Sequence, residues 1–554
     1  MQSKYIENII IGAGPGGLQL GYFFEKDKMD YCIIEKDMIC GSFFAKHPVD
    51  RKLISINKKY TGREEPEFNM RHDWNSLICD DPNFRFTNYT DEYYPYADDY
   101  VKYLNDFYEK YKLNIYFKTL VSKIHTNKSG NFIIECIQDN NKCEYVCAKL
   151  FMATGLNVPN IPNIEGIELA LKYTDFFNMT KDKLTQYANK RIVIIGGGNS
   201  SFEIGNMLTP YCKNIIIICR SPPKFAINTH NTGNIRGVYF KFFDTYLLKS
   251  QNVIDVPIGS ILKITKSIRY QNKLSCHKNN KLEFDDIDTI INCTGMNMDV
   301  SLYDCDNKLD ILNNKIPLLN YKFESLNIKN LYFVGALTQA LDYKMSSGAF
   351  IHGFRYNAEA LFNIISNISN ISNKTWPHEI IGSTVHAIAT KILQRLNNND
   401  ALFQMFGSLY DVVTLIDGKI VYYYQLPLRY IFHNNFINYN WFLIIGFEYG
   451  EDPFDFTEYG PHKTLCPSRA VLSRFLHPVI RFFSVPINAT PQLFNENSVG
   501  QLSGPKLRKS IGFISELHLE ESALFVFTDN ITFFIPLMVY IEGIQIWMRV
   551  LNKS

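Results

Sequence analysis

Four short apolar runs each end at a glycine or at a Thr-Gly pair, and a fifth of the same kind follows them. Runs of this composition predict buried strands of a parallel sheet, and glycine lets the chain turn sharply where a strand ends. The five junctions are Asn8–Ile11 before Gly12, Phe151–Ala153 before Thr154 and Gly155, Arg191–Ile195 before Gly196, Thr289–Cys293 before Thr294 and Gly295, and Leu331–Val334 before Gly335.

Their order predicts an α/β fold with two nested Rossmann-like dinucleotide-binding domains, the second inserted into the first. We expect the first domain at 1–170 and 296–375, and the inserted domain at 171–295. The Asn- and Ser-rich stretch 363–374 predicts a surface connection. It leads to a mixed α+β C-terminal domain of unknown role at 376–554, with a helix near 383–396 and strands near 411–426 and 441–448.

The first glycine motif has the spacing of a dinucleotide fingerprint. Gly12 makes the tight turn, Gly14 admits the pyrophosphate, and Gly17 lets helix and strand pack closely. The helix that starts near Pro15 presents free amides and partial positive charge to phosphates. A second strand ends in Glu35, followed by Lys36, where a carboxylate is expected to bind ribose hydroxyls. We assign this site to FAD.

The second motif, at Gly196 and Gly198, has Ser201 in the third glycine position. Serine is still small enough for helix and strand to pack closely, so Asn199 and Ser200 are expected beside a bound nucleotide. The next strand ends in Cys219 and Arg220 in place of a carboxylate. A cation there suits a 2′-phosphate, which favours NADPH over NADH. The alternative is that Arg220 is a solvated charge at a strand end.

The twelve cysteines argue against a thiol mechanism. Disulfide reductases need two neighbouring thiols beside the flavin. Cys40 lies where such a pair would begin, but no second cysteine follows it closely. Cys143 and Cys147 are better explained by packing on one strand.

The composition fits an ordinary soluble globular protein of 554 residues, with 46% apolar and 20% charged residues. A net charge of +2 gives no field that would attract nucleic acid. The late apolar run 533–540 is broken by Pro536 and is too short for a membrane span. The first eight residues are too short and polar for a signal peptide, so a cytoplasmic location is expected. No metal site is expected, and a homodimer is left open.

Several segments resemble the flavin-containing monooxygenase superfamily. Cys40–Phe44 is similar to its segment against the isoalloxazine, which implies that Ser42 and Phe43 lie near the flavin. Ser55–Lys59 resembles its Ser-Asn-x-x-Lys segment, which implies that Asn57 lies over the flavin and takes part in oxygen activation. The match continues through 93–124 and implies that Val121 lies near the FAD adenine.

Longer strings resemble the ERFAD-type FAD-dependent oxidoreductase domain proteins of the endoplasmic reticulum, and more distantly the nitrosuccinate-forming amine N-monooxygenases. These strings are Arg51–Lys58, Arg71–Leu77, Ser347–Tyr356 and Phe475–Arg481. The signal peptide and the retrieval signal of the endoplasmic-reticulum protein are not matched. The histidine that flavin monooxygenases carry before the second glycine motif is also unmatched, around 172–174. Ala336 stands where many flavoproteins have Asp, and Asp342, just before Ser347, is the nearest replacement.

These resemblances imply an NADPH-dependent flavin monooxygenase. NADPH would reduce FAD, and a C4a-hydroperoxyflavin formed with O2 would oxygenate a small substrate, an amine or amino acid. His72, Trp74 and Asn75 are expected on the substrate side. Arg236 binds either the NADPH phosphate or an anionic substrate. Two alternatives stay open: a reductase or oxidase that inserts no oxygen, and a flavin-stabilised adaptor for protein partners.

Overall fold

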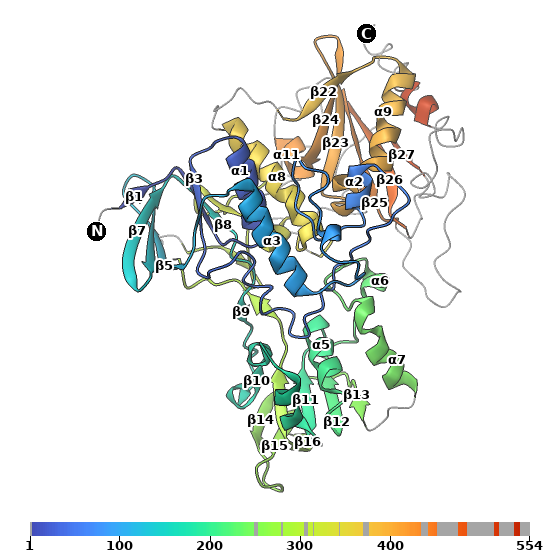
Figure 1. Ribbon diagram of the computed structural model, residues 1–554. Coiled ribbons are helices and arrows are strands. Elements are labelled where there is room, and N and C mark those ends of the chain that lie inside the picture. Colours follow the sequence, from blue (N-terminus) through green and yellow to red (C-terminus); the bar gives the residue numbers. More distant parts are fainter. Residues whose placement is uncertain are drawn as a thin grey trace.

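The structure is a computed structural model in which two parallel sheets lie beside a large antiparallel one (Figure 1). It describes residues 3–248, 253–278, 281–303, 308–313, 315–342, 344–368, 376–433, 441–450, 475–484, 515–519, 537–542 and 544.

The first parallel sheet has the order β21-β8-β2-β3-β4. Its central strands, such as β2, are fully buried aliphatic runs, because helices cover one face and an antiparallel sheet covers the other. β21 returns from far along the chain to pair with β8, so residues on both sides of the inserted segment share one sheet. The strands are β2 (Asn8–Ile11), β3 (Tyr31–Ile34), β4 (Ile115–Tyr116), β8 (Lys149–Met152) and β21 (Leu331–Phe333).

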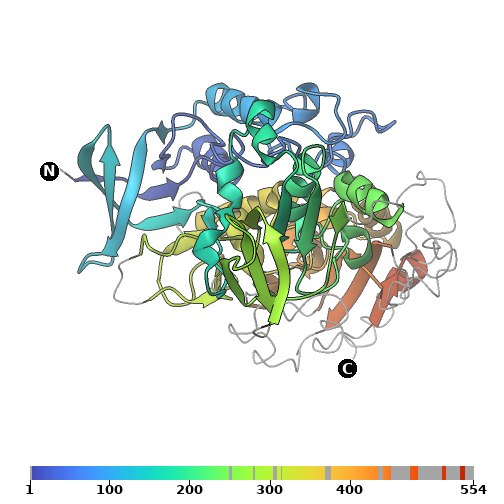
Figure 2. The same ribbon diagram turned by 90° about the horizontal axis from the view of Figure 1, so that it is seen from below.

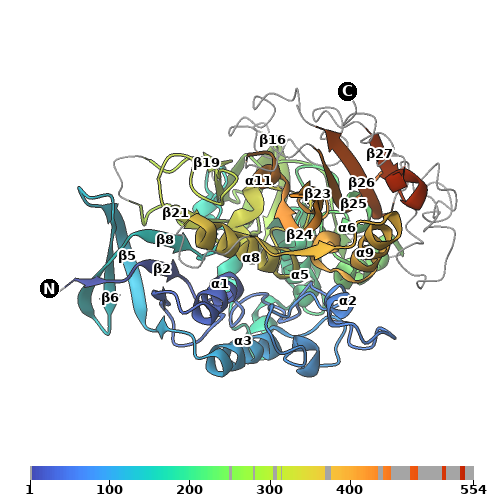
Figure 3. The ribbon, with the colours of Figure 1, turned by 90° about the horizontal axis from the view of Figure 1, so that it is seen from above.

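Three helices pack on this sheet and position the site. α1 (Pro15–Lys26) begins at the first glycine turn. It packs against α8 (Ile351–Ile368) and against α3 (Ala97–Tyr111), as Figure 3 shows from above. A four-stranded sheet lies at one side, in the order β1 (Lys4–Tyr5), β7 (Asn141–Cys147), β6 (Phe132–Gln138) and β5 (Thr119–Thr126).

The second parallel sheet lies at the bottom of Figure 1 and faces the viewer in Figure 2. Its order is β10 (Leu171–Lys172), β17 (Thr289–Asn292), β11 (Arg191–Ile195), β12 (Asn214–Ile218) and β13 (Ile254–Asp255). α5 (Asn199–Leu208) follows β11, and α6 (Ala226–Thr229) and α7 (Phe240–Leu248) follow β12. A small antiparallel sheet flanks it: β14 (Lys263–Lys266), β15 (Leu274–Lys278) and β16 (Lys281–Ile287).

The C-terminal part forms a six-stranded antiparallel sheet. α9 (Val385–Asn398) packs on β22, and α10 (Ala401–Gln404) contacts α8, β23 and β25. The short helices α2 (Pro66–Met70) and α11 (Leu428–His433) contact α9 and β24 respectively. The order is β22 (His378–Ile381), β24 (Lys419–Pro427), β23 (Leu409–Ile416), β25 (Trp441–Glu448), β26 (His477–Ser484) and β27 (Ser515–His518).

The predicted fold class is confirmed, and one local expectation is wrong. The stretch from Asn363 does not begin a surface connection, because α8 continues to Ile368. Ile364 and Ile365 are fully buried on that helix, and their burial outweighs the polar composition. Residues 369–374 of the expected connection lie outside the described part, and the domain boundaries stay a prediction.

Candidate functional site

A cavity of about 820 Å³ begins at the first glycine turn and extends toward the second parallel sheet. This volume is in the range of small-molecule and cofactor sites. Gly12 has a φ of +106°, and a Cβ there would lie 2.8 Å from the carbonyl oxygen of Ala153. A side chain on Gly17 would clash with the Gly12 carbonyl oxygen, so both glycines are required by packing.

Gly14 differs from its neighbours, because a Cβ added there meets no heavy atom within 4 Å and would project into open space. Gly14 and Pro15 line the cavity at the start of α1, where the first amides of the helix are free to bind an anion. Gly16 packs so closely that its Cβ would lie 2.6 Å from Gly335 Cα. The turn therefore fits the approach of a pyrophosphate.

Glu35 closes the same turn and is 5% exposed. Its carboxylate accepts hydrogen bonds from the amides of Ala13 at 2.7 Å and Asp37 at 3.0 Å, and from Ser42 Oγ at 3.3 Å. These bonds hold the glycine turn while Glu35 still lines the cavity. A carboxylate has about four acceptor positions. The pattern thus leaves acceptor capacity for a ribose hydroxyl.

Most residues expected beside the first cofactor line this cavity. Thr154 and Gly155 follow β8, and Gly335 follows β21, so their strands end at the same edge of the sheet. Gly155 and Gly335 have positive φ values of +66° and +70°, which glycine adopts at no steric cost. The other expected residues on the lining are Lys36, Ser42, Phe43, Val121 and Asp342.

Asp342 is 4% exposed and borders the cavity. Its Oδ2 accepts hydrogen bonds from Ser346 Oγ and from the Gly348 amide at 3.0 Å, whereas Oδ1 has no partner. Burial raises the pKa of this carboxyl to about 6. A buried acceptor without a donor costs free energy, so a ligand hydroxyl or amide fits here. Ser347 is buried behind it and does not line the cavity.

Aromatic rings form one wall. Phe43 stacks on His47 with ring centroids 4.0 Å apart and an interplanar angle of 4°, and Phe177 meets His47 edge-on. Burial lowers the pKa of His47 to about 4, so its ring is neutral near pH 7. A flat neutral surface of this kind suits a planar ring system.

The far end of the cavity is formed by Trp74, His352 and Arg236. Trp74 and His352 stack with centroids 4.1 Å apart, and the Arg236 guanidinium lies 4.8 Å from the Trp74 ring centre. His352 is 1% exposed, and neither of its ring nitrogens has a hydrogen-bond partner. Burial, with Arg355 and Arg236 nearby, lowers its pKa well below the usual value. The end of the cavity therefore offers a neutral imidazole and a cation.

Arg355 holds the Trp74 segment in place and is itself fully buried. Its guanidinium donates to the carbonyls of Met70, Asp73 and Ser76 and forms an ion pair of 2.6 Å with Asp400. α8 thereby fixes the 70–76 segment, and with it the position of Trp74.

The other three expected catalytic residues do not line the cavity. Asn75 is buried behind it and accepts a hydrogen bond from the lining residue Ser55 at 2.5 Å. The Asn57 side chain donates to the Thr90 carbonyl at 2.9 Å, so its amide nitrogen is used within the protein, although Oδ1 has no partner. His72 packs against Phe68, and burial lowers its pKa. Their functional roles stay a prediction.

The second glycine turn lies at the start of α5. Gly196 has a φ of +135°, and a Cβ on Gly198 would meet nothing within 4 Å, as at Gly14. Ser201 is fully buried, so serine does fit in the third glycine position. Arg220 is exposed just after β12. Gly295 has a φ of +102°, and a Cβ added to it would meet no heavy atom within 4 Å. Thr294 Oγ1 donates to Asn292 at 2.8 Å, and Ser200 lies in the first turn of α5.

Asn199 connects this turn to the large cavity. Its side chain donates to the carbonyls of Gly233 and Asn234 and accepts from the Arg236 amide at 3.0 Å. The 231–236 loop therefore runs from the second nucleotide turn to the cavity end, where Arg236 meets Trp74. Arg236 is thus connected both to the second nucleotide turn and to the large cavity, and its two predicted roles stay a prediction.

His47, His352 and Phe350 line the cavity but were missed by sequence reasoning. A single histidine has no spacing that marks it as functional. The only available signal was that Phe350 and His352 fall inside the Ser347–Tyr356 string.

Among the described residues, no cysteine lines the cavity. Burial strongly raises the pKa of the Cys40 thiol, which keeps it protonated and unreactive. In the described part of the chain, no helix is both long and apolar enough to cross a membrane.

Comparisons with known proteins agree with this geometry. Residues 9–335 match the pyridine nucleotide-disulphide oxidoreductase family. FAD-dependent oxidoreductase domain-containing protein 2 of Mus musculus is 29% identical over 511 residues, which span 86% of this chain and 75% of that protein. The "probable indole-3-pyruvate monooxygenase YUCCA10" of Arabidopsis thaliana is 26% identical over 228 residues, 39% of this chain and 52% of that protein. A flavin-containing monooxygenase from Stenotrophomonas maltophilia shares the fold, with a TM-score of 0.50 and 16% identity over 66% of this chain and 99% of its own.

Proposed function

Because the chain belongs to the pyridine nucleotide-disulphide oxidoreductase family, we propose that it is a monooxygenase that inserts one oxygen atom of O2 into a small amine or amino acid. Family membership implies FAD and NADPH as cofactors and makes the protein a flavin-dependent oxidoreductase. When bound, FAD accepts the hydride of NADPH and activates O2, which is chemistry that side chains do not supply. Gly12, Gly14 and Glu35 would hold FAD, and Gly198 with Arg220 would hold NADPH.

One observation carries the proposal. The cavity that starts at the FAD turn ends at Trp74, His352 and Arg236, and no described cysteine lines it. Without a thiol pair, electrons cannot pass to a disulfide there. The end of the cavity is instead shaped for a small molecule, which favours oxygen and an organic substrate as acceptors.

The substrate class follows from the charges at that end. Arg236 can pair with a carboxylate, and burial already lowers the pKa of its guanidinium, so an anionic partner would stabilise it. Desolvation favours an uncharged amine over an ammonium. The free amine carries the lone pair that oxygen transfer requires, and His352 can accept a hydrogen bond from its N–H.

A screen of amines and amino acids with NADPH under air tests this proposal. We expect at least one compound to accelerate NADPH oxidation and to yield a product that has gained one oxygen atom, detected by mass spectrometry. The balance is NADPH, H⁺, O2 and substrate to NADP⁺, water and oxygenated substrate. Turnover of NADPH with no oxygenated product for any compound would contradict oxygen insertion and leave a reductase or oxidase.

A further inference from the structure

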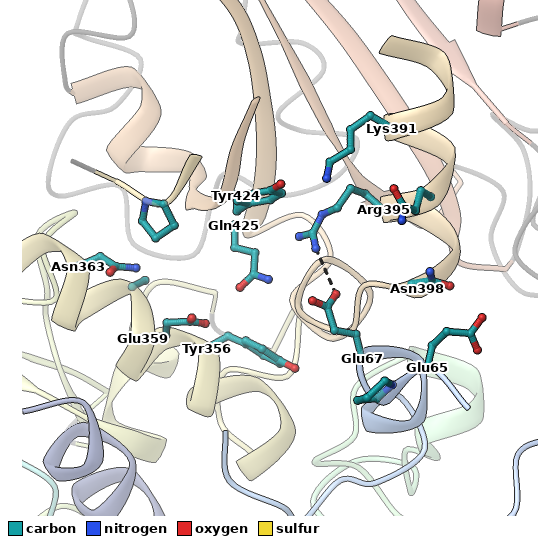
Figure 4. Close-up of a pocket in the computed structure, with 14 residues that line it drawn as sticks. Glu65, Glu67, Tyr356, Glu359, Asn363, Lys391, Arg395, Asn398, Tyr424 and Gln425 are labelled. Carbon is teal, nitrogen blue, oxygen red and sulfur yellow. Dashed lines mark hydrogen bonds and ion pairs between the residues drawn. The ribbon is translucent and has the colours of Figure 1, made fainter. Parts of the chain in front are cut away.

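A second cavity, of about 430 Å³, lies between α8, α2 and the C-terminal α9 and β24 (Figure 4). It shares no lining residue with the cofactor cavity. α8 borders both, because His352 near its start faces the first cavity and Glu359, two turns later, faces the second. Neither the glycine motifs nor the proposed oxygen chemistry uses this second cavity.

Glu359 supplies an anionic group on the α8 side. Figure 4 shows its side chain directed into the cavity, between Gln425 and Tyr356. Within the described part of the chain, its carboxylate has no hydrogen-bond or ion-pair partner. Burial, together with the nearby charge of Glu67, raises its pKa to about 7. The Glu359 side chain is half-buried in the cavity wall, so its carboxylate is accessible to a cationic group of a ligand.

Arg395 supplies a cationic group on the opposite wall. It is 9% exposed, and its guanidinium donates to Asp411 at 2.9 Å and to Glu67 at 3.1 Å. Its remaining nitrogen, Nη2, is buried without a hydrogen-bond partner. The guanidinium lies 4.6 Å from the ring centre of Tyr424, which keeps it in place. Both N–H donors of this nitrogen are therefore unused.

An unpaired carboxylate and an unused guanidinium nitrogen in one cavity call for a ligand with both charges. A buried guanidinium nitrogen without a partner costs free energy, and a ligand carboxylate that accepts its hydrogen bonds recovers this. We propose that the second cavity binds a small free amino acid, with its ammonium on Glu359 and its carboxylate on Arg395.

The charges around Glu359 make binding depend on pH. The ammonium is attracted only when Glu359 is ionised, so binding weakens as the pH falls below about 7. The charged and titratable groups facing Glu359 are Glu65 just before α2, Glu67 of α2, Lys391 and Arg395 of α9, Tyr424 of β24, Tyr356 of α8 and, more distantly, Lys26 of α1. Lys391 is paired with Glu379 at 2.6 Å, and Arg395 with Asp411 and Glu67, so neither forms an ion pair with Glu359, although the charge of Arg395 lowers the pKa of Glu359 in part.

Isothermal titration calorimetry of the full-length flavoprotein, without NADPH, tests the proposal. The probes are glycine, β-alanine and 4-aminobutanoate, which vary the distance between the two charges, with acetate and methylamine as single-charge controls. We expect at least one amino acid to bind at pH 8, far more tightly than either control, and more weakly at pH 6. No binding by any of the three, or equal binding by the controls, would overturn the proposal.

Variants then locate the bound molecule. Glu359→Gln keeps the shape of the side chain and should weaken binding at least about tenfold, since a charge-assisted hydrogen bond is lost. Glu64→Gln, an exposed site outside both cavities, is the matched control and should bind as the wild type does. Arg236→Ala in the cofactor cavity should also leave this binding unchanged. Loss in Arg236→Ala with retention in Glu359→Gln would place the ligand in the substrate site and overturn the proposal, without bearing on oxygen insertion.

Discussion

At the scale of single residues, the two open glycines provide a matched pair of tests. A valine side chain at Gly14 or at Gly198 would meet no protein atom within 4 Å of its Cβ, so both variants should fold. Gly14→Val should be purified without FAD, because the added methyl groups occupy the path of the pyrophosphate. Gly198→Val should keep FAD but bind NADPH poorly. Flavin absorbance and NADPH titration distinguish them, and a yellow Gly14→Val protein would refute the FAD assignment.

Arg220 tests the choice of nicotinamide cofactor. It is exposed at the end of β12, free to meet a 2′-phosphate. Arg220→Ala should raise the KM for NADPH by a factor that corresponds to a binding free energy of roughly 1–3 kcal/mol. The KM for NADH should change little, because only NADPH loses a charged hydrogen bond. Steady-state kinetics with both nucleotides measure this. Equal changes would show that Arg220 does not bind the phosphate.

His352 tests the substrate end of the cavity. His352→Phe keeps the stack on Trp74 but removes both ring nitrogens. We expect FAD content to stay normal and substrate-dependent NADPH oxidation to fall about tenfold, as expected for one lost hydrogen bond. His125→Phe, on the peripheral strand β5, is the control. An unchanged rate in His352→Phe would exclude a contact between His352 and substrate.

Site residues whose role depends on local backbone geometry could be predicted from the sequence. Those whose role depends on where packing places the side chain could not. The glycines were predictable because spacing and turn geometry are local properties of the chain. Asn57 and His72 were expected from resemblance, yet local packing directs them to Thr90 and Phe68. His47 and His352 could not be predicted, because long-range packing alone places them at the cavity.

At the scale of elements, the two parallel sheets are joined by a buried acidic contact. Glu203 on α5 accepts hydrogen bonds from the Val49 amide and from Tyr173 Oη, the latter at 2.7 Å. Burial and the neighbouring Asp50 raise the pKa of Glu203 to about 8. The protonated form is therefore favoured in the folded protein.

This contact predicts a pH-dependent stability. The folded pKa is above the usual value of 4.5, so the folded state binds more protons, and stability falls as the pH rises from about 4.5 through about 8. Glu203→Gln cannot titrate, so its Tm should fall less over this range than that of the wild type. Thermal unfolding at several pH values, with Glu64→Gln as control, measures the difference. Parallel curves for wild type and Glu203→Gln would contradict it.

Strands were easier to predict than the ends of helices. Each aliphatic run before glycine became a buried parallel strand, since such runs have few other stable environments. α8 passed unnoticed beyond Asn363, because Asn363, Ser366 and Asn367 make the end of the helix polar in composition, although Ile364 and Ile365 are buried there. The contacts of α8 with α1, α10 and β24 are long-range and leave no local pattern in the sequence.

At the scale of the whole molecule, the nested order of the two sheets gives the site its form. The chain leaves the first sheet after β8, builds the second, and returns at β21, so the second sheet is inserted within the first. Asn199 and the 231–236 loop connect the second glycine turn to the large cavity. The sequence predicted this nesting from the order of the motifs, but the contact between α8 and the C-terminal sheet depends on long-range packing that no local pattern records.

The central claim, oxygen insertion within this nested fold, is tested most directly by the ratio of hydrogen peroxide released to NADPH consumed under air. Without substrate, reduced flavin returns its electrons to O2, and one peroxide should appear for each NADPH. With an accepted amine or amino acid, NADPH consumption should rise while the ratio falls well below one, because the oxygen is transferred to the substrate. A ratio that stays at one with every compound that accelerates turnover would contradict the claim.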